Sequence, residues 1–239
     1  MSKLRILCLH GFTSNGSIHQ HQVRKITNQC SSDFDFLFPD GPHEVYTSQN
    51  KPDNAWGDFV AANSTSGHRA WWFAKDPDPT TNEPGGFQGL EKSLDYLGRF
   101  IEKSGGQVDV IWGFSQGACF AGMLMALLHE KQRDHPFRKY LPKQQGLPRA
   151  GLFFSGFKAR FSQYDSVYEH GIEVPTLHIM GEQDAIVTNE RSETLKSVCR
   201  DGKTLKHDGG HNIPESEEDQ AAIISFLREV FELKSRESI

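Results

Sequence analysis

A serine framed by two glycines, between an apolar run and a helix-like run, constrains the fold of this chain most. Residues 108–112 (VDVIW) are short and mostly apolar, residues 113–117 read GFSQG, and residues 116–131 are rich in Ala, Met and Leu. This order predicts a buried strand, a sharp turn and a helix, because glycines permit the close backbone approaches of such a turn. Ser115 would then stand above the end of its strand.

Strand-like and helix-like segments alternate along most of the chain. Apolar runs predict strands at 5–9, 34–38, 108–112, 150–154, 175–180 and 203–206. Ser17 is the expected N-cap of a first helix, Phe87 the first residue of the apolar stripe of a second, and further helices are expected at 116–131, 190–198 and 215–233. The alternation predicts an α/β fold with a mostly parallel central sheet and helices on both faces.

The length and charge of the chain exclude several classes of protein. Its 239 residues fit one domain, 1–239, because single cores stop growing at roughly 250–300 residues. A net charge of −5 is not expected of a protein that binds nucleic acid or a membrane surface. No apolar run approaches the roughly 18 residues of a membrane helix, and the four cysteines are widely spaced, so we expect a soluble, reduced, cytoplasmic protein.

The segment from about 39 to 86 differs in composition from the rest. It is rich in Pro, Asp, Asn, Ser, Thr and Gly, yet it contains three of the four tryptophans, Trp56, Trp71 and Trp72. A structureless loop of that length is rare in a compact domain, so we expect short helices and turns that form a lid or a pocket wall. The alternative is that the tryptophans close the core and do not contact a ligand.

Three polar residues follow predicted strands in the order Ser115, Asp184 and His211. In a parallel sheet the carboxyl ends of the strands form one edge, where sites gather. Serine, acid and histidine in this chain order are typical of α/β-hydrolases and predict a Ser-His-Asp triad. Two simpler interpretations remain, namely that Asp184 caps the next helix and that His211 is an ordinary loop histidine.

His211 is preferred to His207 because Gly209 and Gly210 give it a flexible turn, whereas His207 lies at the exit of a predicted strand. A metal site made of His207, Asp208 and His211 is disfavoured, since the segment is a glycine-containing loop and not a helix. We therefore expect no metal and no cofactor.

The backbone N–H groups that would stabilise an oxyanion are expected at Gln116, directly after the serine, and at Phe12, in the loop after the first strand. Thr13 is the alternative second donor and also a candidate for the substrate pocket, together with Trp56, Trp71 and Trp72. His10 precedes this loop, and its expected role is to orient the loop.

Six segments resemble the fungal serine hydrolase (FSH) family of α/β-hydrolases, which has a human relative described as an ovarian-cancer-associated hydrolase. They are LCLHGFTSN (7–15), FLFPDGP (36–42), RAWWF (69–73), GFSQGA (113–118), HIMGEQDAIV (178–187) and GGH (209–211). The resemblance spans nearly the whole chain. It implies a triad of Ser115, Asp184 and His211.

The resemblance also implies a reaction class. Some members are thioesterases that release polyketides in fungal biosynthesis, and others hydrolyse acyl esters. The implied substrate is a small acyl ester or thioester, which an acyl carrier protein could carry. A general carboxylesterase, an acyltransferase, and a binding protein that keeps the fold without turnover are the alternatives.

Overall fold

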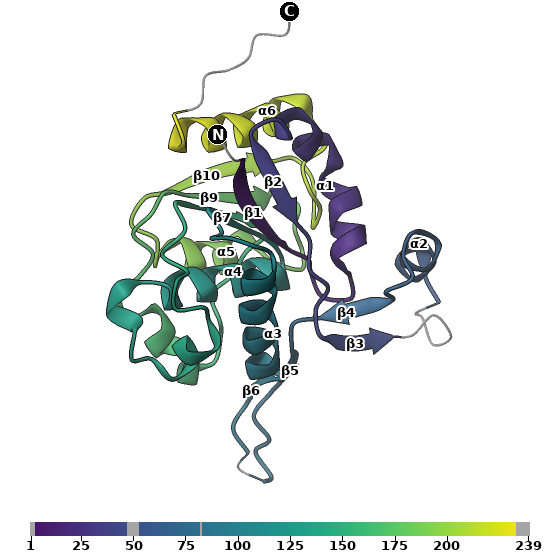
Figure 1. Ribbon diagram of the computed structural model, residues 1–239. Helices are drawn as coiled ribbons and strands as arrows, with labels where there is room; N and C mark the ends of the chain where they lie inside the picture. The colour runs from purple at the N-terminus through teal and green to yellow at the C-terminus, as the bar shows by residue number, and fades with distance from the viewer. Residues whose placement is uncertain (1–2, 47–52, 82, 233–239) are drawn as a thin grey trace, which may run out of the picture.

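Six parallel strands form the central sheet in the order β10-β9-β8-β7-β1-β2 (Figure 1). This computed structural model describes residues 3–46, 53–81 and 83–232. The strands of the sheet are β1 (Leu4–Leu9), β2 (Phe34–Leu37), β7 (Val110–Phe114), β8 (Ala150–Phe154), β9 (Thr176–Gly181) and β10 (Gly202–His207). The predicted fold class, a parallel α/β sheet covered by helices, is confirmed.

The sheet divides the core into two layers because its strands present alternate residues to opposite faces. Leu7 and Ile111 point to the layer that contains α3 (Leu90–Lys103), α4 (Gln116–Leu127) and α5 (Asn189–Lys196). Ile6 and Trp112 point to the layer that contains α1 (Gly16–Cys30) and α6 (Glu217–Val230). Strands buried on both faces read as continuous apolar runs, which explains the pattern in the sequence.

Two predicted helix starts are wrong. The N-cap of α1 is Asn15 and not Ser17, since the Asn15 side chain accepts a hydrogen bond from Ile18 N at 2.9 Å. Phe87 is not helical but lies in the short strand β6 (Gly86–Gln88), and α3 begins only at Leu90. In addition, β7 runs through Phe114, two residues beyond its predicted end. The helix predicted at 215–233 is α6, which starts at Glu217 and already ends at Val230, while residue 233 itself lies outside the described residues.

The segment 39–86 contains short elements, as expected. A two-stranded sheet of β3 (His43–Tyr46) and β4 (His68–Ala70) flanks α2 (Ala55–Asn63). A second two-stranded sheet, β5 (Phe73–Lys75) with β6, is a hairpin that projects from the body of the protein (Figure 1). Between the two pairs lie Trp71 and Trp72, both buried.

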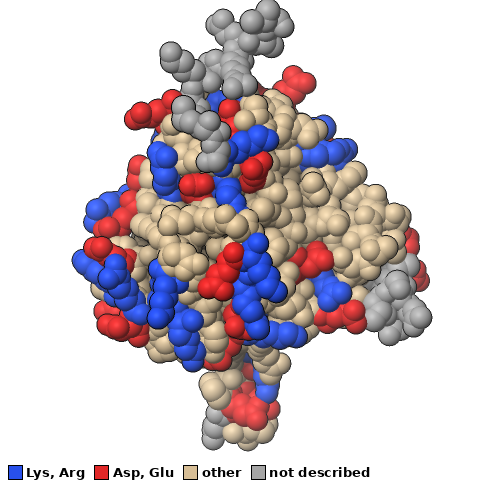
Figure 2. Space-filling view, viewed as in Figure 1, with Lys and Arg blue, Asp and Glu red and all other residues tan. Residues whose placement is uncertain are grey.

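Basic and acidic side chains are interspersed on the face of the molecule that Figure 2 shows. Within the described ranges, no helix is both long enough and apolar enough to span a membrane.

Candidate active site

Ser115 occupies a strained turn between β7 and α4. Its φ of 53° lies in the left-handed region that non-glycine residues rarely adopt. The two neighbouring glycines permit this turn, because a Cβ on Gly113 would lie 2.3 Å from the carbonyl oxygen of Gly117, and one on Gly117 would lie 2.2 Å from that of Leu9. The local sequence therefore dictates a turn that lifts the serine above the sheet and packs α4 against the loop after β1.

His211 is brought to the same edge by the loop that follows β10. A Cβ on Gly181, the last residue of β9, would lie 2.2 Å from the carbonyl oxygen of Gly210, so the loop crosses β9 at contact distance. Gln183 N donates to Gly209 O at 3.0 Å and fixes the crossing. The close crossing requires a glycine at position 181, because any side chain there would collide with the backbone of the loop.

Ser115, His211 and Asp184 form a continuous chain of hydrogen bonds. His211 Nε2 lies 3.0 Å from Ser115 Oγ, and His211 Nδ1 lies 2.8 Å from Asp184 Oδ2. Since an ionised carboxylate only accepts, Nδ1 carries the proton, and Nε2 is left as the acceptor for the serine hydroxyl. The three side chains that the sequence singled out are thus adjacent and in the order that a proton relay requires.

Asp184 is held as a carboxylate although its side chain is only 1% exposed. Burial alone would raise its pKa, but hydrogen bonds, led by the one with His211, outweigh burial and leave the pKa below its ordinary value. The other oxygen, Oδ1, accepts from the backbone N–H groups of Ile186 and Val187 at 2.9 and 2.8 Å. Asp184 therefore also orders the turn that follows it, but it does not cap the next helix, because the N-cap of α5 is Thr188.

His207 does not take part in this chain of hydrogen bonds. It is the last residue of β10, it is buried, and its Nδ1 accepts from Gly209 N at 3.2 Å. Burial lowers its pKa. In the part of the chain that the structure describes, no three His, Cys, Asp or Glu side chains are arranged to hold a metal ion.

The loop after β1 is fixed by His10. Its Nε2 accepts from Gly41 N at 2.8 Å, so Nδ1 carries the proton and lies 2.7 Å from Gly11 O. Burial lowers the pKa of His10 to about 4, which keeps the ring neutral and this pair of bonds intact. Next along the chain, the backbone N–H of Phe12 has no acceptor among the described residues, and neither does that of Gln116.

The side chain of Gln116 was not identified from the sequence as functional. Its Oε1 accepts from Trp71 N and its Nε2 donates to Trp72 O, each at 2.9 Å. The indole of Trp71 in turn donates to His10 O at 2.8 Å. The tryptophan segment is thereby attached both to the start of α4 and to the loop after β1.

The four pocket candidates occupy different positions. Trp71 and Trp72 are buried against Phe120, as in the alternative in which tryptophans close the core. Trp56 is partly buried, and its indole donates to Thr13 O at 2.8 Å. This hydrogen bond joins α2 to the loop after β1. The exposed aromatic rings near the site are instead Phe12 and Phe73, 46% and 36% exposed, which meet edge to face at 6.4 Å.

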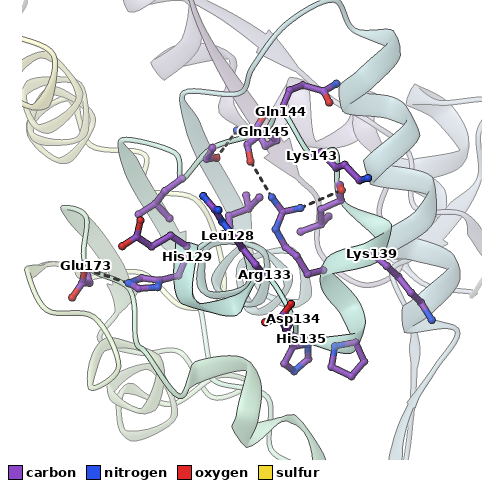
Figure 3. A pocket seen from close by; sticks show the side chains of 16 residues that line it. Leu128, His129, Arg133, Asp134, His135, Lys139, Lys143, Gln144, Gln145 and Glu173 are labelled. Carbon is purple, nitrogen blue, oxygen red and sulfur yellow. Dashed lines mark hydrogen bonds and ion pairs between the residues drawn. The ribbon is translucent and has the colours of Figure 1, made fainter.

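A cavity of about 990 Å³ lies away from these residues (Figure 3). It begins at Leu128, at the opposite end of α4 from Ser115, which an α-helix of that length places about 18 Å away. Arg138 lines it and donates to the carbonyl oxygens of Leu141 and Gln145 at 3.2 and 3.3 Å. The arginine therefore fixes a surface loop, and the cavity is separate from the serine.

Comparisons with known proteins identify the family of the chain. A family model described as "Serine hydrolase (FSH1)" matches residues 1–223. The chain is 32% identical over 241 residues to an esterase of Aedes aegypti, covering 99% of this chain and 80% of that protein. It is 29% identical over 228 residues to Esterase OVCA2 of Homo sapiens, covering 94% and 95% respectively.

Two solved structures share the fold. Arabidopsis thaliana SOBER1 matches with a TM-score of 0.58 at 21% identity, covering 96% of this chain and 100% of that one. Zea mays acyl-protein thioesterase 2 matches with a TM-score of 0.58 at 15% identity, covering 96% and 94%.

Proposed function

The chain belongs to the serine hydrolase (FSH1) family and is a hydrolase that acts on esters, and on that premise we propose that it cleaves carboxyl esters and thioesters of acyl chains through a Ser115-His211-Asp184 triad. The observation that carries the proposal is the pair of hydrogen bonds through His211, at 3.0 Å to Ser115 and 2.8 Å to Asp184. The strained φ of Ser115 supports it independently, because such strain gathers at nucleophilic serines on sharp turns.

In the first half of the reaction, His211 Nε2 removes the proton of Ser115 Oγ, which attacks the carbonyl carbon of the substrate. Asp184 keeps the imidazole in the required tautomer and stabilises the cation that forms. His211 then passes its proton to the leaving alcohol or thiol as the bond to the acyl carbon breaks. Water repeats the sequence on the acyl-enzyme and releases the acid.

The tetrahedral intermediates carry negative charge on the former carbonyl oxygen. We assign its stabilisation to the backbone N–H groups of Gln116 and Phe12, whose lack of acceptors among the described residues supports the role. Each such donor contributes about 3 kcal/mol to the barrier reduction, on the scale measured for the loss of one donor. Thr13 then shapes the loop without donating to the substrate.

The acyl chain would lie along Phe12 and Phe73, the exposed rings beside the loop after β1. Aromatic surface that remains exposed next to a nucleophile favours an apolar substrate portion. In this proposal the segment 39–86 is a wall of the acyl site, with Trp71 and Trp72 behind it, within one domain covering 1–239.

A fluorophosphonate probe tests the proposal directly, since it phosphonylates only an activated serine. We expect the wild type to be labelled and Ser115→Ala to be unlabelled, whereas Ser192→Ala, a buried serine on α5, keeps full labelling. An unlabelled but folded wild type would leave a binding protein on the hydrolase fold as the better description.

A narrower form of the proposal is a thioesterase that releases an acyl or polyketide product from a carrier protein in fungal biosynthesis. Comparing the p-nitrophenyl ester and the N-acetylcysteamine thioester of one acyl chain separates this form from a general carboxylesterase. Adding an alcohol or amine acceptor and analysing the products separates both from an acyltransferase.

We place the enzyme in a reducing compartment, the cytoplasm. All four cysteines are free, and burial raises the pKa of the Cys119 thiol and of the Cys30 thiol. Thiols of this kind act as small apolar side chains and do not require oxidation for stability.

A further inference from the structure

A second serine lies between the strand ends that carry Ser115 and Asp184. Ser155 follows β8, which is hydrogen-bonded to β7 on one side and to β9 on the other. Ser115 N donates to Phe154 O and Ser155 N donates to Ile179 O, each at 2.8 Å. The ladder thus continues one residue past each strand and places the two serines side by side at the same edge.

The backbone of Ser155 is strained in the same way as that of the nucleophile. Its φ is 47°, a value that glycine adopts without penalty and serine does not. Ser155 is also only 1% exposed, so no contact with solvent explains the residue type. A serine at a position where glycine fits the backbone better indicates a use for its hydroxyl.

The hydroxyl of Ser155 is buried and, among the described residues, makes no hydrogen bond of good geometry. A buried hydroxyl without a partner is costly, so one should lie within reach. Asp184 is the nearest candidate, because it follows β9, the strand whose Ile179 O accepts from Ser155 N, and the Ser155 hydroxyl is among the groups that lower the pKa of the Asp184 carboxyl. Burial acts in the opposite direction there, and His211 and Val187 contribute the stronger lowering effects.

Asp184 also has the capacity to accept this bond. Its Oδ1 accepts from two backbone N–H groups, whereas within the described ranges Oδ2 accepts only from His211. A carboxylate oxygen can accept two hydrogen bonds. Asp184 Oδ2 therefore has room for one further donor.

We propose that Ser155 is a positioning residue whose hydroxyl donates to the Asp184 carboxylate and holds it toward His211. The inference rests on the proposed function, since it assigns a role within that triad. An orienting carboxylate that is itself held by a further donor keeps the imidazole in place when it becomes charged.

Two substitutions separate the hydroxyl from the backbone strain. Ser155→Gly removes the hydroxyl and relieves the strain, so we expect a Tm at least equal to that of the wild type but a kcat lower by about tenfold or more. Ser155→Thr keeps a hydroxyl but places a β-branched residue at positive φ, so we expect a lower Tm and a kcat within about threefold of the wild type. KM should be nearly unchanged in both variants, because the hydroxyl does not contact substrate.

Ser155→Ala, which keeps the strain and loses the hydroxyl, should lose kcat as the glycine variant does. Ser192→Ala is the matched control, since the Ser192 hydroxyl is also buried without a partner among the described residues but lies on α5. A wild-type kcat in Ser155→Gly would overturn the proposal. An equal loss of kcat in the glycine and threonine variants would also overturn it, because backbone geometry would then be the cause.

The same assays distinguish this inference from the function on which it rests. If the wild type neither reacts with the fluorophosphonate probe nor hydrolyses p-nitrophenyl esters, the proposed function fails. If Ser115→Ala is inactive and all Ser155 variants are fully active, only the role of Ser155 fails.

Discussion

Gln116 holds the backbone of Trp71 by accepting its N–H at 2.9 Å, so the residue after Ser115 also fixes the aromatic segment. The same side chain donates to Trp72 O. Gln116 is therefore bound to two residues that precede it in the chain by 45 and 44 positions. Its backbone N–H is proposed to act on the substrate, while its side chain holds the segment that is proposed as the pocket wall.

Replacing Gln116 by alanine should reduce both stability and activity. The variant leaves the N–H of Trp71 and the carbonyl of Trp72 buried without partners, which costs about 2–4 kcal/mol of unfolding free energy. We expect kcat/KM to fall about tenfold as the segment shifts. Urea titration and p-nitrophenyl ester kinetics measure the two effects.

Gln145→Ala is the matched control for this prediction. Gln145 accepts from Val108 N at 2.9 Å and donates to Val108 O at 3.0 Å, the same kind of bond pair away from the site. It should lose similar stability with nearly unchanged kcat/KM. Equal losses of kcat/KM in both variants would mean that lowered stability alone explains the effect.

Gly117→Ala should disturb the proposed oxyanion site. An added Cβ would lie 2.2 Å from Leu9 O and 2.5 Å from His10 O, and both are backbone atoms that cannot rotate away. The loop after β1 must therefore move from α4, and with it the Phe12 N–H. We expect kcat to fall about 100-fold, the scale of one lost donor.

A matched glycine controls for the usual effect of alanine on the unfolded chain. A Cβ on Gly146 would meet no atom within 4 Å, so Gly146→Ala should keep both kcat and stability. A wild-type kcat in Gly117→Ala would show that the loop after β1 does not contribute to the proposed oxyanion site.

Phe73→Ala tests the proposed acyl surface. Burying each methylene of a substrate chain contributes about 0.8 kcal/mol, so the wild type should prefer octanoyl to acetyl p-nitrophenyl esters in kcat/KM. Loss of the ring should reduce that preference about tenfold with little change for acetate. Tyr46→Ala is the control, since Tyr46 is similarly exposed at 38% but lies on β3, which pairs with β4.

The strands and the three site residues could be predicted because the signals that specify them are local. A fully buried parallel strand is an apolar run, and the turn at Ser115 requires glycines at 113 and 117 that are visible in the sequence. For His211 the glycine that the loop requires is Gly181, which lies on β9 and lets the loop cross that strand, whereas a side chain on Gly210 would fit. Chain order then placed all three at one edge of the sheet.

The errors arose where tertiary contacts chose between equivalent local signals. Asn15 and Ser17 are both good N-caps, but Gly16 N donates to Asp40 Oδ1 at 2.7 Å, and this contact starts the helix at Gly16. Phe87 lies three residues before Leu90 and so matches the helical spacing, although it belongs to a hairpin. No sequence pattern predicts the hydrogen bond between the Gln116 side chain and the backbone N–H of Trp71.

A buried histidine should make the protein less stable in acid. His19 is fully buried between the rings of Phe38 and Trp112, and burial lowers its pKa to about 3. The unfolded chain, with a histidine pKa near 6.5, binds the proton first. The contribution of neutral His19 to stability is therefore complete above pH 6.5 and decreases as the pH falls from 6.5 toward 3.

Replacing His19 by phenylalanine should remove the part of the acid sensitivity that is due to His19. Protonation of His19 in the unfolded chain lowers the free energy of unfolding by ~2 kcal/mol between pH 7 and pH 5. The decrease over this interval should therefore be smaller by that amount in His19→Phe than in the wild type. Because His10 and His178 have lowered pKa values of about 4 and 3, the variant keeps part of the dependence. Val23→Ala, also on α1, should instead lower stability by about 2 kcal/mol at both pH values. Parallel losses in the wild type and His19→Phe would show that this ring does not govern acid stability.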